Sequence, residues 1–135
     1  MKAKSIFVNL PIKDLTRTRD FWTKLGFSFN EQFSDERALC LVFNDGLIYS
    51  MLITHEMFSS FTNRPIADGT TTEIIIAIEV DSREQVDKMV KLALENGASR
   101  YRESVDHTWM YYDSFADLDG HHWEIMFTDP NQIQQ

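Results

Sequence analysis

The strongest constraint in this sequence is an order of predicted elements that occurs twice. Gly26 and Gly97 each follow a predicted helix and lie 71 positions apart, and the Asp-Gly pairs at 45–46 and 119–120 lie 74 positions apart. Glycine is favoured where a helix ends and in tight turns between strands. Because the two spacings are nearly equal, we predict an internal duplication of a β-α-β-β-β module.

Apolar alternation and turn residues outline both copies. Asp14 and the pair Asp81-Ser82 are suited to begin the two helices, because their side chains can accept hydrogen bonds from the first helical turn. The predicted strands cover 6–10, 27–33, 37–43 and 47–54 in the first copy, and 73–80, 101–106, 109–115 and 122–128 in the second. We therefore predict a single domain over 1–135, made of modules 1–60 and 73–130 with a linker at 61–72.

Charge and hydropathy exclude several classes of partner. The chain has 13 basic and 21 acidic residues, a net charge of −8, and no basic cluster, so we expect no nucleic acid and no anionic membrane as partner. No apolar run approaches the roughly 18 residues of a membrane span. The N-terminus lacks the apolar core of a secretory signal, and we expect a cytoplasmic protein. The single cysteine, Cys40, lies in an apolar segment and is predicted to be buried.

Two segments at opposite ends of the chain carry recognisable motifs. One covers residues 7–15 and continues through Phe21-Trp22 and Leu25-Gly26-Phe27, and the other is Asp117-Leu118-Asp119-Gly120-His121-His122-Trp123-Glu124. Together they resemble the vicinal oxygen chelate superfamily, which includes glyoxalase I, bleomycin and fosfomycin resistance proteins and extradiol dioxygenases. The resemblance implies an α+β fold in which two tandem modules curl mixed sheets around a cleft, and a homodimer whose second chain completes the site.

The same resemblance implies a divalent metal held by His and Glu side chains on the first and last strands of each module. The first-strand positions are here Phe7 and Ile75, and neither side chain binds a metal. The last-strand positions are Glu124, which fits, and Ser50, or Met51 if the alignment slips by one residue. Because such sites usually need about three protein ligands, we predict that the metal site is absent and that no cofactor is held.

Polar residues near these positions are the remaining candidates for a site. Strand alternation puts Asn9 on the face of Phe7, where its amide either orients a ligand or satisfies a loop backbone. Glu124 is either a general base or a carboxylate bonded to backbone or to an arginine. His122 shares the face of Glu124, although we favour a structural or solvent-facing role for it. An unconventional metal site of His107, His122 and Glu124 is a remote alternative.

Aromatic residues make up 13% of the chain, which is rich for a small domain. Trp109, Tyr111 and Phe115 alternate along one face of a predicted strand, with Met110 and Tyr112 on the other face, and we expect one of these rows to line a cleft. Aromatic residues line many small-molecule pockets. Trp109 and Tyr111 are therefore predicted ligand contacts, together with Phe7 and Ile75.

Three functions follow from these observations. The leading hypothesis is a metal-free protein that binds a small apolar or aromatic molecule in the cleft, with Glu124, Asn9 and Ser50 as its polar anchors. One alternative is an enzyme, either a metal-dependent lyase or extradiol-type dioxygenase with an atypical site, or a metal-free isomerase that uses Glu124 as its base. Another is a family member that acts through protein contacts alone.

Overall fold

A computed structural model describes residues 1–132 and divides the chain into two units with the same topology. The first unit is Met1–Asp68 and the second begins at Gly69, so the boundary falls within the predicted linker. The first unit contains β1 (Ile6–Ile12), α1 (Leu15–Lys24), β2 (Ser28–Phe29), the 3-10 turn η1 (Glu31–Phe33), β3 (Ala38–Asn44), β4 (Ile48–Thr54) and α2 (His55–Ser59). The second contains β5 (Ile75–Glu79), α3 (Arg83–Glu95), β6 (Val105–Asp106), β7 (Met110–Ala116) and β8 (His122–Thr128).

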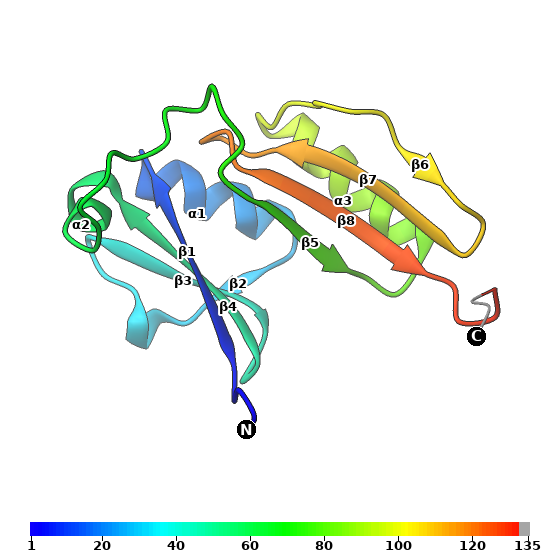
Figure 1. The fold of residues 1–135 in the computed structure, drawn as a ribbon, viewed down its shortest axis with the longest axis horizontal. Coiled ribbons are helices and arrows are strands. Elements are labelled where there is room, and N and C mark those ends of the chain that lie inside the picture. Colours follow the sequence, from blue (N-terminus) through cyan, green and yellow to red (C-terminus); the bar gives the residue numbers. More distant parts are fainter. Residues whose placement is uncertain (133–135) are drawn as a thin grey trace. The chain divides into compact units, whose positions relative to one another are not determined.

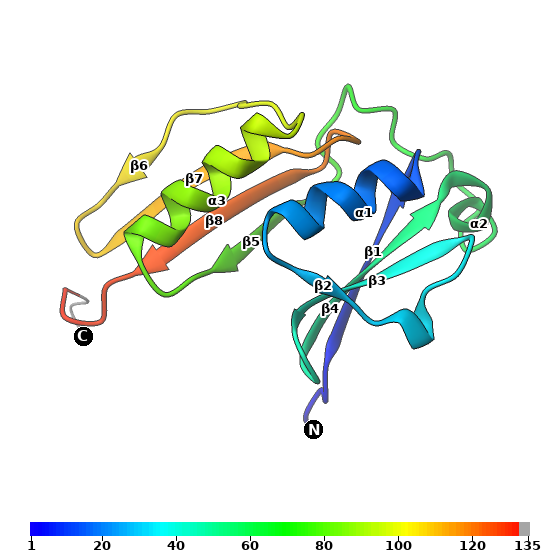
Figure 2. The ribbon, with the colours of Figure 1, turned by 180° about the vertical axis from the view of Figure 1, so that it is seen from behind.

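Each unit has one mixed four-stranded sheet with a helix across one face (Figures 1 and 2). The strand orders are β1-β4-β3-β2 and β5-β8-β7-β6. In both sheets the first strand runs parallel to the last, and the remaining neighbours are antiparallel. The predicted α+β class and the repeated β-α-β-β-β order are therefore confirmed.

The helices begin and end where the sequence predicts. The Asp14 carboxylate accepts a hydrogen bond from the Arg17 backbone N–H at 2.9 Å, and the Ser82 hydroxyl does the same for Gln85 at 3.1 Å. The backbone after each helix enters the left-handed region at a glycine, with φ of 100° at Gly26. Both ends satisfy backbone groups that a helix leaves unpaired.

Three predicted elements differ from the structure. The strand predicted at 27–33 is reduced to β2, because the Asn30 side chain accepts a hydrogen bond from the Gln32 N–H and turns the chain into η1. The strand predicted at 101–106 is reduced to β6. The third difference is the short helix α2 after β4, where no helix was predicted; it forms because the Thr54 hydroxyl accepts from the Met57 N–H.

The buried core of each unit lies between the sheet and its helix. In the second unit, Phe115, Trp123 and Ile125 are completely buried and face α3, whose buried residues are Val86, Val90 and Ala93. Tyr111 is on the same face, because its hydroxyl donates to Asp87 of α3. The side chains of alternate residues lie on the other face. We call the face turned away from the helix the distal face of each sheet.

The segment that enters β5 is held against the turn between β7 and β8. The Glu73 carboxylate is 2.5 Å from Nδ1 of His121, and the space above Gly120 is bounded by Gly69. Within the turn, Asp117 accepts hydrogen bonds from the His121 N–H and from the indole of Trp123. Burial raises the pKa of Asp117, against the effect of these bonds.

In the part of the chain that the structure describes, none of the helices has the length and apolar character of a membrane span.

Candidate functional site

A carboxyl group flanked by small residues occupies the centre of the distal face in the second unit. Glu124 on β8 lies opposite Ala77 on β5 and opposite Ser114 on β7. Directly opposite residues in a sheet project to the same face. Along β8, the neighbours of Glu124 on this face are the larger His122 and Met126. Glu124 is therefore flanked laterally by only a methyl and a hydroxymethyl group, and we call its surroundings between His122 and Met126 the gap.

An aromatic pair forms one end of this gap. The ring of Tyr101 stacks on the imidazole of His122, with centroids 3.8 Å apart and planes 12° apart. Tyr101 lies outside the strands, between the isolated bridge of Ser99 with Ala116 and the start of β6. We call Tyr101, Ser114, His122 and Glu124 the β8 cluster. It combines two hydroxyls, an imidazole and a carboxyl group.

The two hydroxyls of the β8 cluster are buried without hydrogen-bond partners. Among residues 1–132, the Tyr101 oxygen and the Ser114 Oγ are the buried side-chain polar atoms that lack a partner. Burial raises the pKa of Tyr101, and the negative charge of Glu124 adds to the rise. Ser114 partly offsets it, so the two hydroxyls are near each other without meeting in hydrogen-bond geometry. Each unpaired buried hydroxyl costs stability, about 1–3 kcal/mol by analogy with mutational data.

The other end of the gap is also aromatic. Tyr112 on β7 lies opposite Met126 on β8, on the distal face. The guanidinium of Arg102 lies 5.5 Å from the centroid of the Tyr112 ring, and the His107 ring lies 6.4 Å from it. The distal row of β7 is therefore Met110, Tyr112 and Ser114.

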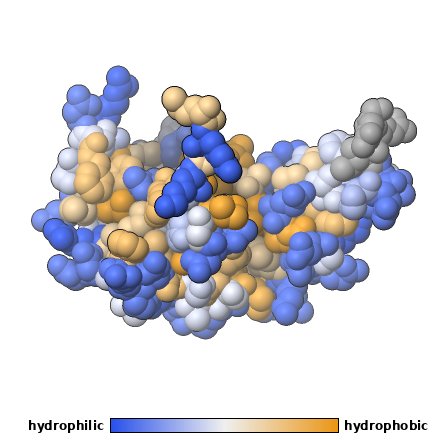
Figure 3. Space-filling view, turned by 90° about the horizontal axis from the view of Figure 1, so that it is seen from below, coloured by the Kyte–Doolittle hydropathy of each residue, from blue (hydrophilic) through white to orange (hydrophobic). Residues whose placement is uncertain are grey.

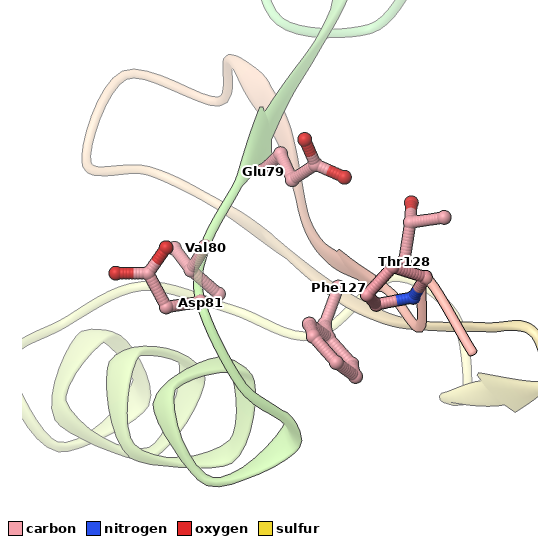
Figure 4. Close-up of a pocket in the computed structure, with 6 residues that line it drawn as sticks. Glu79, Val80, Asp81, Phe127 and Thr128 are labelled. Atoms are coloured by element: carbon pink, nitrogen blue, oxygen red, sulfur yellow. The ribbon is translucent and has the colours of Figure 1, made fainter.

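A surface pocket of about 460 Å³ lies where β5 and β8 end, lined by Glu79, Val80, Asp81, Phe127, Thr128 and Pro130. In Figure 4 the carboxylates of Glu79 and Asp81 point in different directions. The pocket therefore offers no converging pair of charged groups. Its connection to the distal face is through Glu79, which lies opposite Met126.

The distal face of the first unit is apolar where the second is polar. Phe7 stacks on Tyr49, with centroids 4.7 Å apart, and is 52% exposed. Asn9 is exposed on the same face, opposite Met51. Ser50 lies on the helix side instead, where it is completely buried and its hydroxyl donates to the Val8 carbonyl at 2.8 Å. The distal position of β4 is therefore that of Met51.

The predicted aromatic contacts are not brought together with Glu124. Tyr111 faces α3, and its short hydrogen bond to Asp87 is the main reason that its pKa is raised to about 12. Phe115 is fully buried in the core. Trp109 precedes β7 and is 44% exposed beside His107. It lies beyond the pair of Met110 with Thr128, roughly 16 Å along the chain from Ser114.

Three predicted residues do lie together: Ile75 is directly opposite His122, and Glu124 is the next distal residue on β8. Sequence reasoning missed Tyr101 and Ser114. The sequence does contain a signal for Ser114, because a small hydroxyl residue follows Met110 and Tyr112 in the same row. Tyr101 had none, because its position depends on pairing between Ser99 and the distant Ala116.

The side chains at the family's metal positions do not fit a divalent ion. Phe7 and Ile75 offer no donor atom, the Ser50 hydroxyl is engaged on the helix side, and Met51 offers only a thioether. Glu124 remains as one carboxyl group. In the part of the chain that is described, no three His, Cys, Asp or Glu side chains are grouped so that they could hold a metal.

Comparison with known proteins places this geometry in a family. The model of the Glyoxalase/Bleomycin resistance protein/Dioxygenase superfamily matches residues 5–125. No curated protein matches. A hypothetical protein from S. aureus is 26% identical, with a TM-score of 0.78 over 94% of this chain and 95% of that chain.

Two further structures share the fold at lower identity. FosX, a fosfomycin resistance protein from Listeria monocytogenes, is 20% identical, with a TM-score of 0.69 over 97% of this chain and 98% of that chain. A bleomycin resistance determinant encoded on the transposon Tn5 is 16% identical, with a TM-score of 0.65 over 93% and 98%. The family model spans both repeats and ends just after Glu124, and the chain belongs to the Glyoxalase/Bleomycin resistance protein/Dioxygenase superfamily.

Proposed function

We propose that this chain binds a small, partly aromatic molecule on the distal face of the β5–β8 sheet without a metal. The observation that carries the proposal is the pair of buried, unpartnered hydroxyls of Tyr101 and Ser114 beside the Glu124 carboxyl group. Buried polar atoms are normally paired, and unpaired ones concentrate where a ligand or water completes them. A ligand that enters beside Glu124 can do so once the Tyr101 ring moves aside.

The surroundings of the gap support an aromatic ligand. His122 with Tyr101 bounds one end, and Met126 with Tyr112 bounds the other. Small-molecule sites combine apolar and aromatic walls with a few polar groups that fix orientation. Two structural relatives are named for resistance to fosfomycin and to bleomycin, which agrees with small-molecule recognition as the use of this fold.

Heteronuclear NMR of labelled protein tests the proposal with a panel of small aromatic compounds. We expect shifts in the backbone signals of Ser114, His122 and Glu124, unchanged when a chelator removes divalent ions. Glu124→Gln should weaken binding about three- to tenfold, the effect of one polar contact. Thr128→Ala, on the same face but outside the cluster, is the matched control. If binding appears only after Zn, Ni, Fe or Mn is added, the atypical metal enzyme replaces this proposal.

A metal-free isomerase is the second candidate, favoured by the same hydroxyls. Glu124 would accept a proton from carbon, and the Tyr101 and Ser114 hydroxyls would donate to the oxygen that gains negative charge. Exchange of substrate hydrogen for deuterium, followed by NMR for any compound that binds, separates this candidate from binding alone. Exchange that Glu124→Gln abolishes without loss of binding would establish it.

We also propose that the protein forms a homodimer. Apolar side chains of Ile6, Phe7, Ile48 and Ile75 are at least 43% exposed, and apolar patches are visible between hydrophilic residues in Figure 3. Clusters of exposed apolar side chains are typical of surfaces where proteins associate. Light scattering at micromolar concentration should give twice the mass of one chain. The mass of a single chain would contradict the proposal.

A further inference from the structure

We propose that the β8 cluster recognises an amide edge, a carbonyl oxygen beside an N–H group, on a planar aromatic molecule. This inference rests on the proposed function and names the class of ligand. A primary aromatic carboxamide or a lactam has this edge. The carbonyl would accept from the Ser114 and Tyr101 hydroxyls, and the N–H would donate to the Glu124 carboxylate.

The donor half of the site is defined by the two hydroxyls. Ser114 is completely buried, and neither its Oγ nor the Tyr101 oxygen has a partner in the described structure. A hydroxyl donates one proton, and a carbonyl oxygen has two lone pairs. One carbonyl oxygen can therefore accept from both hydroxyls.

The acceptor half is the Glu124 carboxyl group. Among the described residues, the side chain of Glu124 has no ion pair and no hydrogen bond, although it is only partly exposed. Ser114 is its direct neighbour across the strands, so the donor and acceptor halves are side by side. A ligand group whose acceptor lies beside its donor matches this arrangement, with the acceptor at the hydroxyls and the donor at Glu124. A carboxylate ligand does not, because it would place two negative groups together.

Shape selects a flat group next to this edge. Ala77 leaves room on the β5 side of Glu124, and the stacked rings of Tyr101 and His122 bound the gap along the strand. An aromatic ring gains from contact with such rings. Tyr101 must turn aside for the ligand edge to reach Ser114, and it lies in a segment outside the helices and strands.

Three probes with the same ring separate the two halves of the edge: benzamide, acetophenone and benzoate. Benzamide carries the full edge, acetophenone only the acceptor, and benzoate two acceptors with a negative charge. In NMR titrations of the full chain we expect benzamide to bind most tightly and benzoate most weakly. Ser114→Ala should weaken benzamide and acetophenone alike, by about three- to tenfold each. Glu124→Gln should weaken benzamide, leave acetophenone unchanged and strengthen benzoate.

Ser50→Ala is the matched control, since Ser50 is equally buried in the first unit but its hydroxyl is bonded to Val8. It should leave the three affinities unchanged and lower the melting temperature, whereas Ser114→Ala should not lower it.

If all three compounds shift the cluster signals with equal affinity, the amide-edge inference is wrong and the proposed function stands. If Ser114→Ala leaves the affinities for benzamide and acetophenone unchanged, the hydroxyls bind a bridging water only, and the inference is also wrong. If none of the compounds shifts these signals, both proposals fail.

Discussion

The two units share one topology but place their polar groups differently. The first unit has an apolar distal face, where Phe7 stacks on Tyr49, and its ion pair of Arg19 with Glu31 is solvent-exposed. The second unit has Glu124 at the centre of its distal face and a nearly buried carboxylate, Asp113, on the opposite face. The two units therefore share a scaffold set by strand order. Single positions on this scaffold decide where the polar side chains of each unit lie.

The largest expected effect tests whether the two scaffolds are equivalent. Trp22 and Trp123 are each at most 1% exposed on the helix side of their sheets. Trp22→Ala and Trp123→Ala should each lower the free energy of unfolding by about 3–5 kcal/mol, through lost burial and the cavity left behind. Urea unfolding followed by far-ultraviolet circular dichroism measures both. Trp109→Ala, at an exposed site, should cost less than about 1 kcal/mol.

Trp123→Phe sharpens this test, because it keeps most of the apolar volume and removes the N–H that donates to Asp117 at 2.8 Å. It should cost about 1–3 kcal/mol, since Asp117 is buried and would lose one partner. If Trp123→Ala lowers the free energy of unfolding much less than Trp22→Ala does, the two cores are not comparable.

An intermediate effect is expected where the two units differ in their ion pairs. Arg100 donates to both oxygens of Asp113, at 2.6 and 3.1 Å, and the Asp113 side chain is only 7% exposed. Arg100→Met should cost about 2–3 kcal/mol, because it leaves a nearly buried carboxylate without its cation. Arg19→Met, which breaks the exposed pair with Glu31, should cost less than about 1 kcal/mol.

The same unfolding measurement applies to both arginine variants. Arg100→Lys keeps the charge but loses the two-pronged geometry, so its cost should lie between that of the wild type and that of Arg100→Met. Equal costs for Arg100→Met and Arg19→Met would remove the distinction between a buried and an exposed pair.

The smallest expected effect is a pH dependence confined to the second unit. The hydrogen bond to Asp87 and burial raise the pKa of Tyr111 to about 12, against about 10 in an unfolded chain. Its contribution to stability is therefore complete below pH about 10 and is lost as the pH rises to about 12. We expect a loss of about 1–2 kcal/mol, reduced from the full linkage value by partial solvent exposure.

Stability curves at alkaline pH check this prediction. The decline between pH about 10 and about 12 should be shallower in Tyr111→Phe than in the wild type. Tyr49→Phe is the control from the first unit and should follow the wild type. Parallel declines in the wild type and Tyr111→Phe would contradict the proposed role of the Asp87 bond.

Local signals in the sequence were sufficient for the scaffold. Asp14, Gly26 and Gly97 act through their nearest neighbours in the chain, so helix boundaries and turns could be predicted. The short extents of β2 and β6 could not, because such strands exist only through pairing with β3 and β7. After β2, the local turn chemistry of Asn30 outweighed strand propensity.

The site was harder to predict because a shift of one residue changes the face of a strand. Four residues after its turn glycine, Glu124 is distal, whereas Ser50, at the same spacing from Gly46, is buried on the helix side. The turns differ: Asn44 pairs with Ile48 beside a register shift, but Ala116 pairs with His122. For the same reason an aromatic run could not show which row is distal: Tyr111 and Phe115 face α3, and Tyr112 is distal.

The attachment of Glu73 to His121 has a mechanical consequence. Tension applied through the linker reaches the second unit at Gly69–Glu73, and the contacts of this segment with Gly120 and His121 transmit it to the turn before β8. The load is thus taken up ahead of the first β5–β8 pair, Ile75 with His122. We expect strain in the linker to be carried first by this attachment, before it reaches the row that holds Glu124.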